Sequence, residues 1–277
     1  MKSISSRDNP LYKELKRLAT SAQARRKSRC SLLDGVHLAA ACLQQAGAPQ
    51  LCVVAESAVD HVEVVPILAQ CETGGAPCIS LPDVLYQALS QVENGVGLLL
   101  VIATPQPQAP QVLTTSAVLL DGLQDPGNLG SILRSAAAAG IRQVLCSGGT
   151  AAAWSPKVLR AGMGAHFLLD IIEDADLLSL CRSSRIPVLA TSSHAQKTIY
   201  QNDLTQEVAW LFGHEGQGVA DALLEAAGAR VAIPHLGPVE SLNVAAAAAV
   251  CFFEQARQRQ DGLKNRASLP ERVVPPL

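Results

Sequence analysis

Three polar turns carry most of the residues in this chain that could do chemistry, and each of them follows an apolar stretch. The first runs from residue 121 to residue 134 and bends at Pro126 and Gly127 before an apolar-periodic segment begins. It supplies Asn128 and Arg134. A guanidinium presents a fork of donors that matches the oxygens of a phosphate. The simpler interpretation is that Asn128 caps the following helix and that Arg134 is an exposed helical arginine.

The second turn, residues 213–218, is rich in glycine and has the sequence Gly-His-Glu-Gly-Gln-Gly. Its glycines would let backbone amides approach a ligand closely. Glu215 is its carboxylate, and it could instead be a favourable charge ahead of a helix at 220–227. The spacing differs from the Gly-x-Gly-x-x-Gly of dinucleotide-binding proteins, and the acidic residue expected about 20 positions later is missing. An oxidoreductase on a conventional nucleotide-binding fold is therefore disfavoured.

The third turn, residues 233–244, bends at Gly237 and Pro238 and then opens a C-terminal helix. On local chemistry Ser241 is a candidate helix cap and Glu240 a partner for the helix dipole. A fourth polar segment, Thr191 to His194, follows another apolar stretch and could line a ligand pocket. The sequence has no cluster of carboxylates and histidines at ligand spacing, so we expect no metal site.

The elements that must position these turns are six apolar segments separated mostly by helical ones. The predicted strands are Ala117–Asp121, Gln143–Ser147, Phe167–Ile172, Pro187–Thr191, Val208–Gly213 and Arg230–Pro234. Apolar strands with helical crossovers predict a mostly parallel α/β sheet covered on both faces. Ligands bind beyond the carboxyl ends of such strands, where all three turns would lie. We therefore expect the turns to converge on one site.

A linker divides the chain, because residues 104–111 contain three prolines and no charge. Before it the pattern predicts a small α/β domain. Its expected helices are Pro10–Ala19, Val36–Gln45, Val62–Cys71 and Pro82–Gln91, and its expected strands are Leu51–Ala55 and Leu98–Ile102. The predicted domains are residues 1–106 and 107–277.

The composition is that of a globular protein with aliphatic cores, since 48% of the residues are hydrophobic and only 3% aromatic. The eight cysteines form no Cys-x-x-Cys pair, which favours buried thiols in a reducing compartment. The chain starts with polar and charged residues, and the apolar run Val244–Phe253 is about half of what a membrane span requires. We therefore expect a cytoplasmic protein without a membrane partner.

Charge is distributed unevenly along the chain. The net charge is −2, yet residues 1–30 hold nine Lys and Arg against two acids. Such a segment could attract the phosphates of a nucleic acid, although a solvated helix face explains it equally well. The candidate phosphate-binding residues here are Arg7, Lys13, Arg25, Arg26 and Lys27.

Taken together, the three turns resemble the signature motifs of the SpoU (TrmH-like) RNA ribose 2′-O-methyltransferases of the SPOUT superfamily. The resemblance implies an S-adenosyl-L-methionine-dependent enzyme. It implies a SPOUT-type parallel sheet with a C-terminal trefoil knot, preceded by an L30e-like substrate-binding domain. The residues matching the family's catalytic positions are Asn128, Arg134, Glu215, Ser241 and Asn243. Donor-binding positions are Gly213, Ile233 and Leu242, to which we add Thr191 and Gly218. We expect Arg134 to bind a phosphate beside the target ribose and not to act as the general base, because a guanidinium is a poor base.

The first domain resembles the family at Ser6–Leu15 and Leu33–Leu38, with Asp34 where the family usually has Glu. The family is dimeric, so a homodimer is expected. The most favoured substrate is 23S-type ribosomal RNA. The alternatives are a tRNA ribose 2′-O-methyltransferase and a non-catalytic RNA-binding protein with the same fold.

Overall fold

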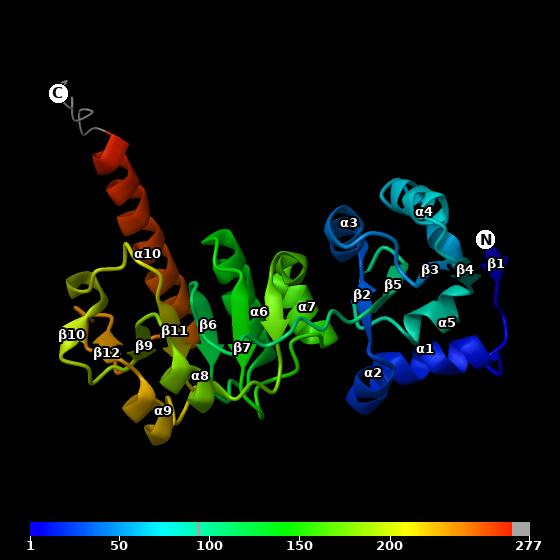
Figure 1. The fold of residues 1–277 in the computed structure, drawn as a ribbon. Helices are drawn as coiled ribbons and strands as arrows, with labels where there is room; N and C mark the ends of the chain where they lie inside the picture. The colour runs from blue at the N-terminus through cyan, green and yellow to red at the C-terminus, as the bar shows by residue number, and fades with distance from the viewer. Residues whose placement is uncertain (93–94, 268–277) are drawn as a thin grey trace. The chain divides into compact units, whose positions relative to one another are not determined.

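The computed structural model describes residues 1–92 and 95–267, which form two β-sheets with helices packed against them (Figure 1). The chain divides into two compact units. The first unit contains residues 1–108, 125–134 and 151–173, and the second unit contains residues 109–124, 135–150 and 174–267 of the described chain. Residues 104–116, which include the expected linker, form neither helix nor strand. A domain boundary near residue 106 stays a prediction.

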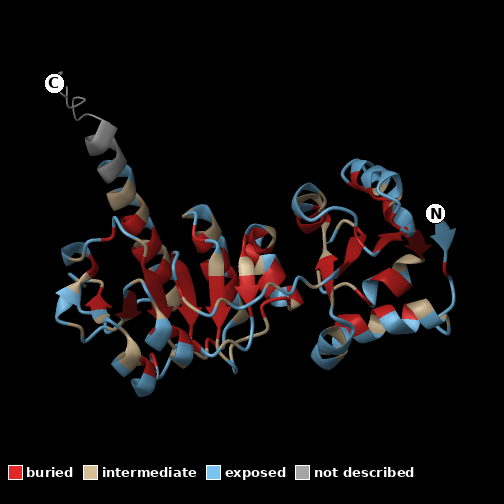
Figure 2. Cartoon of the chain, viewed as in Figure 1, coloured by how far each residue is buried: buried red, intermediate tan, exposed pale blue. Residues whose placement is uncertain are grey.

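The first unit is built on a mixed five-stranded sheet of order β1-β4-β3-β5-β2. Its strands are β1 (Lys2–Ser3), β2 (Cys30–Asp34), β3 (Leu51–Ala55), β4 (Cys78–Leu81) and β5 (Leu98–Ala103). Its helices in residues 1–92 are α1 (Pro10–Thr20), α2 (Ala22–Ser28), α3 (Val36–Gln45), α4 (Val64–Thr73) and α5 (Asp83–Gln87), with a 3₁₀ turn η1 (Glu56–Ala58). Strand β5 is antiparallel to β2 and β3, whereas β3 is parallel to β4. All residues of β3 are buried (Figure 2), which explains why its apolar run was recognisable.

The bounds of β3 and α3 agree with the prediction, whereas α5 is shorter than the expected helix over 82–91. Strands β2 and β4 were not predicted. Each is short and includes a serine, Ser31 or Ser80, which interrupts the apolar run.

A buried histidine, His166, lies in residues 151–173 of the first unit, within the 3₁₀ turn η2 (Ala165–Leu168) that follows α7 (Pro156–Gly162). The Nε2 atom of His166 is 2.9 Å from the carbonyl oxygen of Ala153, and its ring lies 5.1 Å from that of Trp154. A Cβ on Gly162 would lie only 2.5 Å from Cε1 of this ring. Burial lowers the pKa of His166 from 6.5 to about 4, although the hydrogen bond to Ala153 opposes this effect.

We expect His166 to make the protein acid-sensitive. The unfolded chain takes up a proton as the pH falls below 6.5, whereas the folded protein does so only near pH 4. The stabilisation from the neutral ring is therefore complete above pH 6.5 and is lost as the pH falls towards 4, by at most about 3 kcal/mol. The midpoint of thermal unfolding should change less between pH 7 and pH 5, which lie on either side of the unfolded-state pKa of 6.5, in His166→Phe than in the wild type. The exposed-histidine control His37→Gln should keep the full difference, and an unchanged difference in His166→Phe would contradict the prediction.

The second sheet has the order β10-β12-β9-β11-β6-β7-β8, and six of its seven strands belong to the second unit. Its strands are β6 (Ala117–Leu120), β7 (Gln143–Cys146), β8 (Asp170–Ile172), β9 (Val188–Thr191), β10 (Lys197–Thr198), β11 (Ala209–Phe212) and β12 (Ala229–Ala232). The helices are α6 (Pro126–Ala138), which begins in the first unit, α8 (Leu177–Ser183), α9 (Asp221–Ala226) and α10 (Val244–Ala267), with a 3₁₀ turn η3 (Ile199–Gln201). The pairings of β6, β7, β9, β10, β11 and β12 are all parallel, as predicted.

One predicted strand is wrong over half its length. Phe167–Ile172 was expected to be extended, but Phe167 and Leu168 belong to the 3₁₀ turn η2, and only Asp170–Ile172 forms a strand. Gly164, with φ of 86°, turns the chain into η2. A short apolar run does not distinguish a turn of helix from a strand.

The core of the second unit joins the central strands to α10. Every residue of β6 and β11 is buried (Figure 2). Phe212 packs edge-on against Phe252 of α10 at 5.7 Å, and Trp210 Nε1 donates to Gln255 Oε1 at 2.8 Å. Gln255 in turn donates to Ser116 Oγ at 3.0 Å. These contacts hold α10 against β11, which fixes where the start of α10 lies.

Two further expectations concern burial. Seven of the eight cysteines are buried free thiols, as predicted, whereas Cys30 is half-buried. Among the described residues, none of the helices has both the length and the apolar character needed to cross a membrane.

Candidate active site

The glycine turn, residues 213–218, joins β11 to the segment before α9 and closes on itself. The N–H of His214 donates to the Gly218 carbonyl at 2.9 Å, and the N–H of Gly218 donates back at 2.8 Å. Gly218 has φ of 74°, which favours glycine. A Cβ on Gly213 would lie 2.1 Å from the carbonyl carbon of Gly218 and from the nitrogen of Val219. Only glycine therefore fits at the base of this turn.

The turn after β6 lies against the glycine turn. The backbone N–H of Gln124 donates to Glu215 Oε2 at 3.1 Å. Asp121 accepts from the N–H of Ala220 at 3.0 Å and from Ser147 Oγ at 3.2 Å. The carboxyl ends of β6 and β11 are thus joined through Glu215 and Asp121.

Sequence reasoning did not select Asp121 or Gln124 as site residues. Asp121 directly follows β6, and a carboxylate at the end of a central parallel strand was the signal that could have identified it.

The third turn leads into α10, and Asn243 caps that helix. Its Oδ1 accepts from the N–H groups of Ala245 at 2.9 Å and Ala246 at 3.3 Å. The expectation that Ser241 is the cap was wrong, because α10 begins at Val244, two residues later than that assignment required. Asn243 therefore has a structural role as the cap of α10. It also lines the cavity described in the next paragraph.

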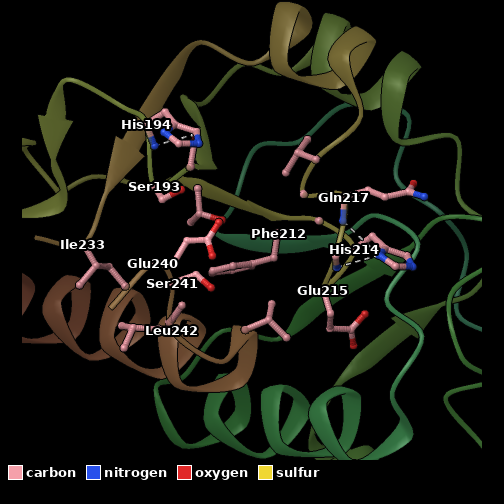
Figure 3. Close-up of a pocket in the computed structure, with 18 of the residues that line it drawn as sticks. Ser193, His194, Phe212, His214, Glu215, Gln217, Ile233, Glu240, Ser241 and Leu242 are labelled. Carbon is pink, nitrogen blue, oxygen red and sulfur yellow. Dashed lines mark hydrogen bonds between the residues drawn. The ribbon is translucent and has the colours of Figure 1, made fainter. Parts of the chain in front are cut away.

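A cavity of about 760 Å³ lies in the second unit, beyond the carboxyl ends of β9, β11 and β12. Figure 3 shows its two walls: His214, Glu215 and Gln217 on the glycine turn, and Glu240, Ser241 and Leu242 on the segment before α10. The predicted site residues that line it are Thr191, Gly213, Glu215, Gly218, Ile233, Ser241, Leu242 and Asn243. Lining residues that the prediction omitted include Phe212, Val219, Asp221 and Leu224. The second and third turns therefore meet at one cavity.

The charged groups around this cavity are acidic. Within the described part of the chain, its lining includes the carboxylates of Glu215, Asp221 and Glu240 and contains no Lys or Arg. Such a field favours a neutral or cationic ligand over a polyphosphate.

Asn128 and Arg134 do not line this cavity among the described residues; both lie on α6, in the part assigned to the first unit. The expectation that Asn128 caps the helix was wrong. The helix begins at Pro126, and Asp125 Oδ1 accepts from the backbone N–H of Asn128 at 2.7 Å, as a cap does. Asn128 therefore lies within the first turn of α6, and Arg134 is exposed two turns further on. The helix stops before Gly140, whose φ of 79° is the expected left-handed end.

The candidate phosphate-binding residues of the first unit have different surroundings. Arg7, Arg26 and Lys27 are exposed. Lys13 is also exposed, but it pairs with Asp8 at 2.9 Å. Arg25 is half-buried, and it donates to the carbonyl of Leu18 at 2.7 Å, near the end of α1; burial lowers its pKa. Arg25 therefore stabilises the α1–α2 corner.

Comparison with known proteins identifies the family to which the three turns belong. The model of the SpoU rRNA Methylase family matches residues 115–253. The 23S rRNA (guanosine(2553)-2′-O)-methyltransferase RlmP of Bacillus subtilis (strain 168) is 31% identical over 255 residues, which span 91% of this chain and 98% of that protein.

Two crystal structures are similar over nearly the whole chain. One, of an RNA 2′-O ribose methyltransferase, is 31% identical with a TM-score of 0.78, and the match covers 93% of this chain and 99% of the other. The second is an AdoMet-bound rRNA methyltransferase from Sinorhizobium meliloti, 26% identical with a TM-score of 0.78 over 92% and 97% of the two chains. With its glycine turn, its α10 cap and these matches, the chain belongs to the SpoU rRNA methylase family.

Proposed function

We propose that this protein transfers a methyl group from S-adenosyl-L-methionine to a ribose 2′-hydroxyl of 23S-type ribosomal RNA. Family membership makes it an S-adenosylmethionine-dependent RNA methyltransferase. The observation that carries the proposal is the cavity where the second and third signature turns meet, with Glu215, Ser241 and Asn243 in its lining. The named B. subtilis relative supports the choice of ribosomal RNA.

The cavity suits the proposed methyl donor. Its volume of about 760 Å³ lies within the range of small-molecule sites. Glycine at position 213 brings the backbone of residues 218 and 219 close to the end of β11, which leaves bare backbone at the cavity wall. The carboxylates around the cavity complement a sulfonium cation. Gly213, Gly218, Thr191, Ile233 and Leu242 are the residues that we propose to hold the donor.

The protein's part in the reaction is mainly alignment and proton handling. S-adenosylmethionine supplies an already activated methyl group when bound. Glu215, whose Oε2 accepts from the N–H of Gln124, brings a carboxylate to the lining of the cavity, and a carboxylate can accept from a sugar hydroxyl. Ser241 and Asn243 add hydroxyl and amide groups across the cavity. We propose that these three residues, with Asn128, hold the acceptor ribose while its hydroxyl loses a proton.

We propose that Arg134 binds a phosphate next to the target ribose. Its side chain is exposed on α6, and its planar donor fork fits two phosphate oxygens. A positively charged group at that place would fix the RNA strand without serving as a base.

The remaining family features are also proposals. We propose an L30e-like fold for the first domain, a trefoil knot in the C-terminal part of the second, and a cytoplasmic homodimer. Light scattering coupled to size-exclusion chromatography tests the oligomeric state.

The exposed arginines and lysines of the first unit should bind RNA phosphates. The double substitution Arg26→Ala/Lys27→Ala is expected to weaken rRNA binding and to lower the slope of log affinity against log salt by about 2, since each lost phosphate contact lowers it by about 1. Filter binding at several salt concentrations measures the slope. The control Arg182→Ala/Lys197→Ala removes two exposed cations of the second unit, and its slope should match the wild type. Affinity that does not depend on salt would contradict the assignment.

The function itself is tested by methyl incorporation. Ribosomal RNA and tRNA from cells that lack this gene should be offered to the purified protein with S-adenosylmethionine carrying a labelled methyl group. Incorporation into rRNA at a 2′-O position, mapped by resistance to alkaline cleavage, supports the proposal. Incorporation into tRNA alone would favour the tRNA alternative. RNA binding without donor binding, measured by calorimetry, would favour a non-catalytic protein.

A further inference from the structure

His214 ties the glycine turn to itself through its side chain. Its Nδ1 accepts from the backbone N–H of Gly216 at 2.9 Å and of Gln217 at 3.3 Å. Its own N–H and carbonyl pair with Gly218 at the other end of the turn. In Figure 3 the imidazole lies beside the main chain of the turn, with both side-chain hydrogen bonds drawn.

These contacts affect the turn rather than the core. Gly216 and Gln217 are exposed, so water can replace the ring as their acceptor if it is removed. Removing the ring therefore lets the Gly-Gln-Gly segment become disordered, because glycines gain more conformational freedom than other residues when they are released. A disordered turn must be ordered again when a ligand binds, which weakens binding.

We propose that His214 is a positioning residue that holds the glycine turn in its donor-binding shape before the donor arrives. This rests on the proposed function. The turn supplies one wall of the cavity and carries Glu215, whose carboxylate is already fixed at its far end by the N–H of Gln124. With the ring anchoring the residues after Glu215, both the backbone and the side chain of Glu215 keep one orientation. Nδ1 must be the acceptor, so the neutral ring carries its hydrogen on Nε2.

Three variants isolate this role. His214→Leu removes the acceptor and keeps similar bulk. His214→Asn restores an acceptor, since an asparagine side chain can accept from the N–H two residues further on. His61→Leu is the matched control, because His61 Nδ1 also accepts a backbone N–H two residues on, from Glu63 at 3.2 Å, in the first unit.

Donor affinity, measured by calorimetry with S-adenosylmethionine, is the main readout. His214→Leu should raise Kd and the KM for the donor about tenfold, the size of one to two lost hydrogen bonds. The thermal midpoint should stay unchanged. His214→Asn should recover most of the affinity, and His61→Leu should match the wild type. Without donor, amide exchange at residues 216 and 217 should be faster in His214→Leu than in the wild type.

Several results would overturn the proposal. Wild-type affinity in His214→Leu, or an equal loss in His214→Leu and His214→Asn, would exclude an acceptor role. A wild-type protein that binds S-adenosylmethionine but methylates no RNA would overturn the proposed function, while the affinity series still decides the role of His214. A wild-type protein that binds no donor would overturn both.

Discussion

Substituting alanine for Gly213 is expected to abolish measurable binding of S-adenosylmethionine. The new Cβ would lie 2.1 Å from two backbone atoms, the carbonyl carbon of Gly218 and the nitrogen of Val219. Neither atom belongs to a flexible side chain, so the turn must open or β11 must shift at its end. Either movement displaces the backbone wall of the cavity and Glu215 with it. Since a misplacement of about 1 Å can lower a reaction rate about 100-fold, we expect methyl transfer to fall by at least that factor together with donor binding.

The matched control for Gly213 is Gly228, which lies between α9 and β12. A Cβ there would meet only the backbone of Val188, at 3.6 Å or more, which is ordinary contact. Gly228→Ala should therefore bind the donor as the wild type does. Calorimetric titration of both variants, with circular dichroism to verify the fold, makes the comparison. If Gly213→Ala bound the donor with wild-type affinity, the close approach of Gly213 to Gly218 would not matter for the site.

Replacing Arg134 with lysine is expected to lower methyl transfer by roughly 100-fold while donor affinity stays the same. Arg134 is exposed on α6 and does not line the cavity that we propose for the donor, so neither the fold nor donor binding should depend on it. Lysine keeps the positive charge but lacks the planar fork that binds two phosphate oxygens together. The RNA strand would then be held with less directional control, and the 2′-hydroxyl would reach the reactive position less often.

This effect is measured by single-turnover methylation of rRNA, with donor affinity determined in parallel. Arg182→Lys, the same change at an exposed arginine of α8, should leave both quantities unaltered. Full turnover in Arg134→Lys would remove the phosphate-binding role. Loss of donor binding in that variant would instead assign Arg134 to the donor site.

Local sequence determined the central strands and the places where the turns begin. Strands β6 and β11 are buried on both faces, so their sequences are continuous apolar runs that could be recognised without neighbours. The glycine turn could be identified in the same way, because positions that need close backbone approach or positive φ exclude other residues. The helix caps could not. Asp125 and Asn128 are both short acceptors, and so are Ser241 and Asn243. Which member of each pair caps the helix depends on the residue at which the helix begins, and that residue is set by where the preceding strand and turn end.

Only the tertiary structure decided which groups meet. The hydrogen bond from Gln124 to Glu215 joins residues 91 positions apart, and nothing in the pattern around either residue specifies its partner. The same is true of Phe212 with Phe252 and of Trp210 with Gln255, the contacts that hold α10 and its cap at the cavity. Periodicity reports which face of an element is apolar, but pairing between elements is set by packing and strand order, and these arise only when the whole sheet has formed.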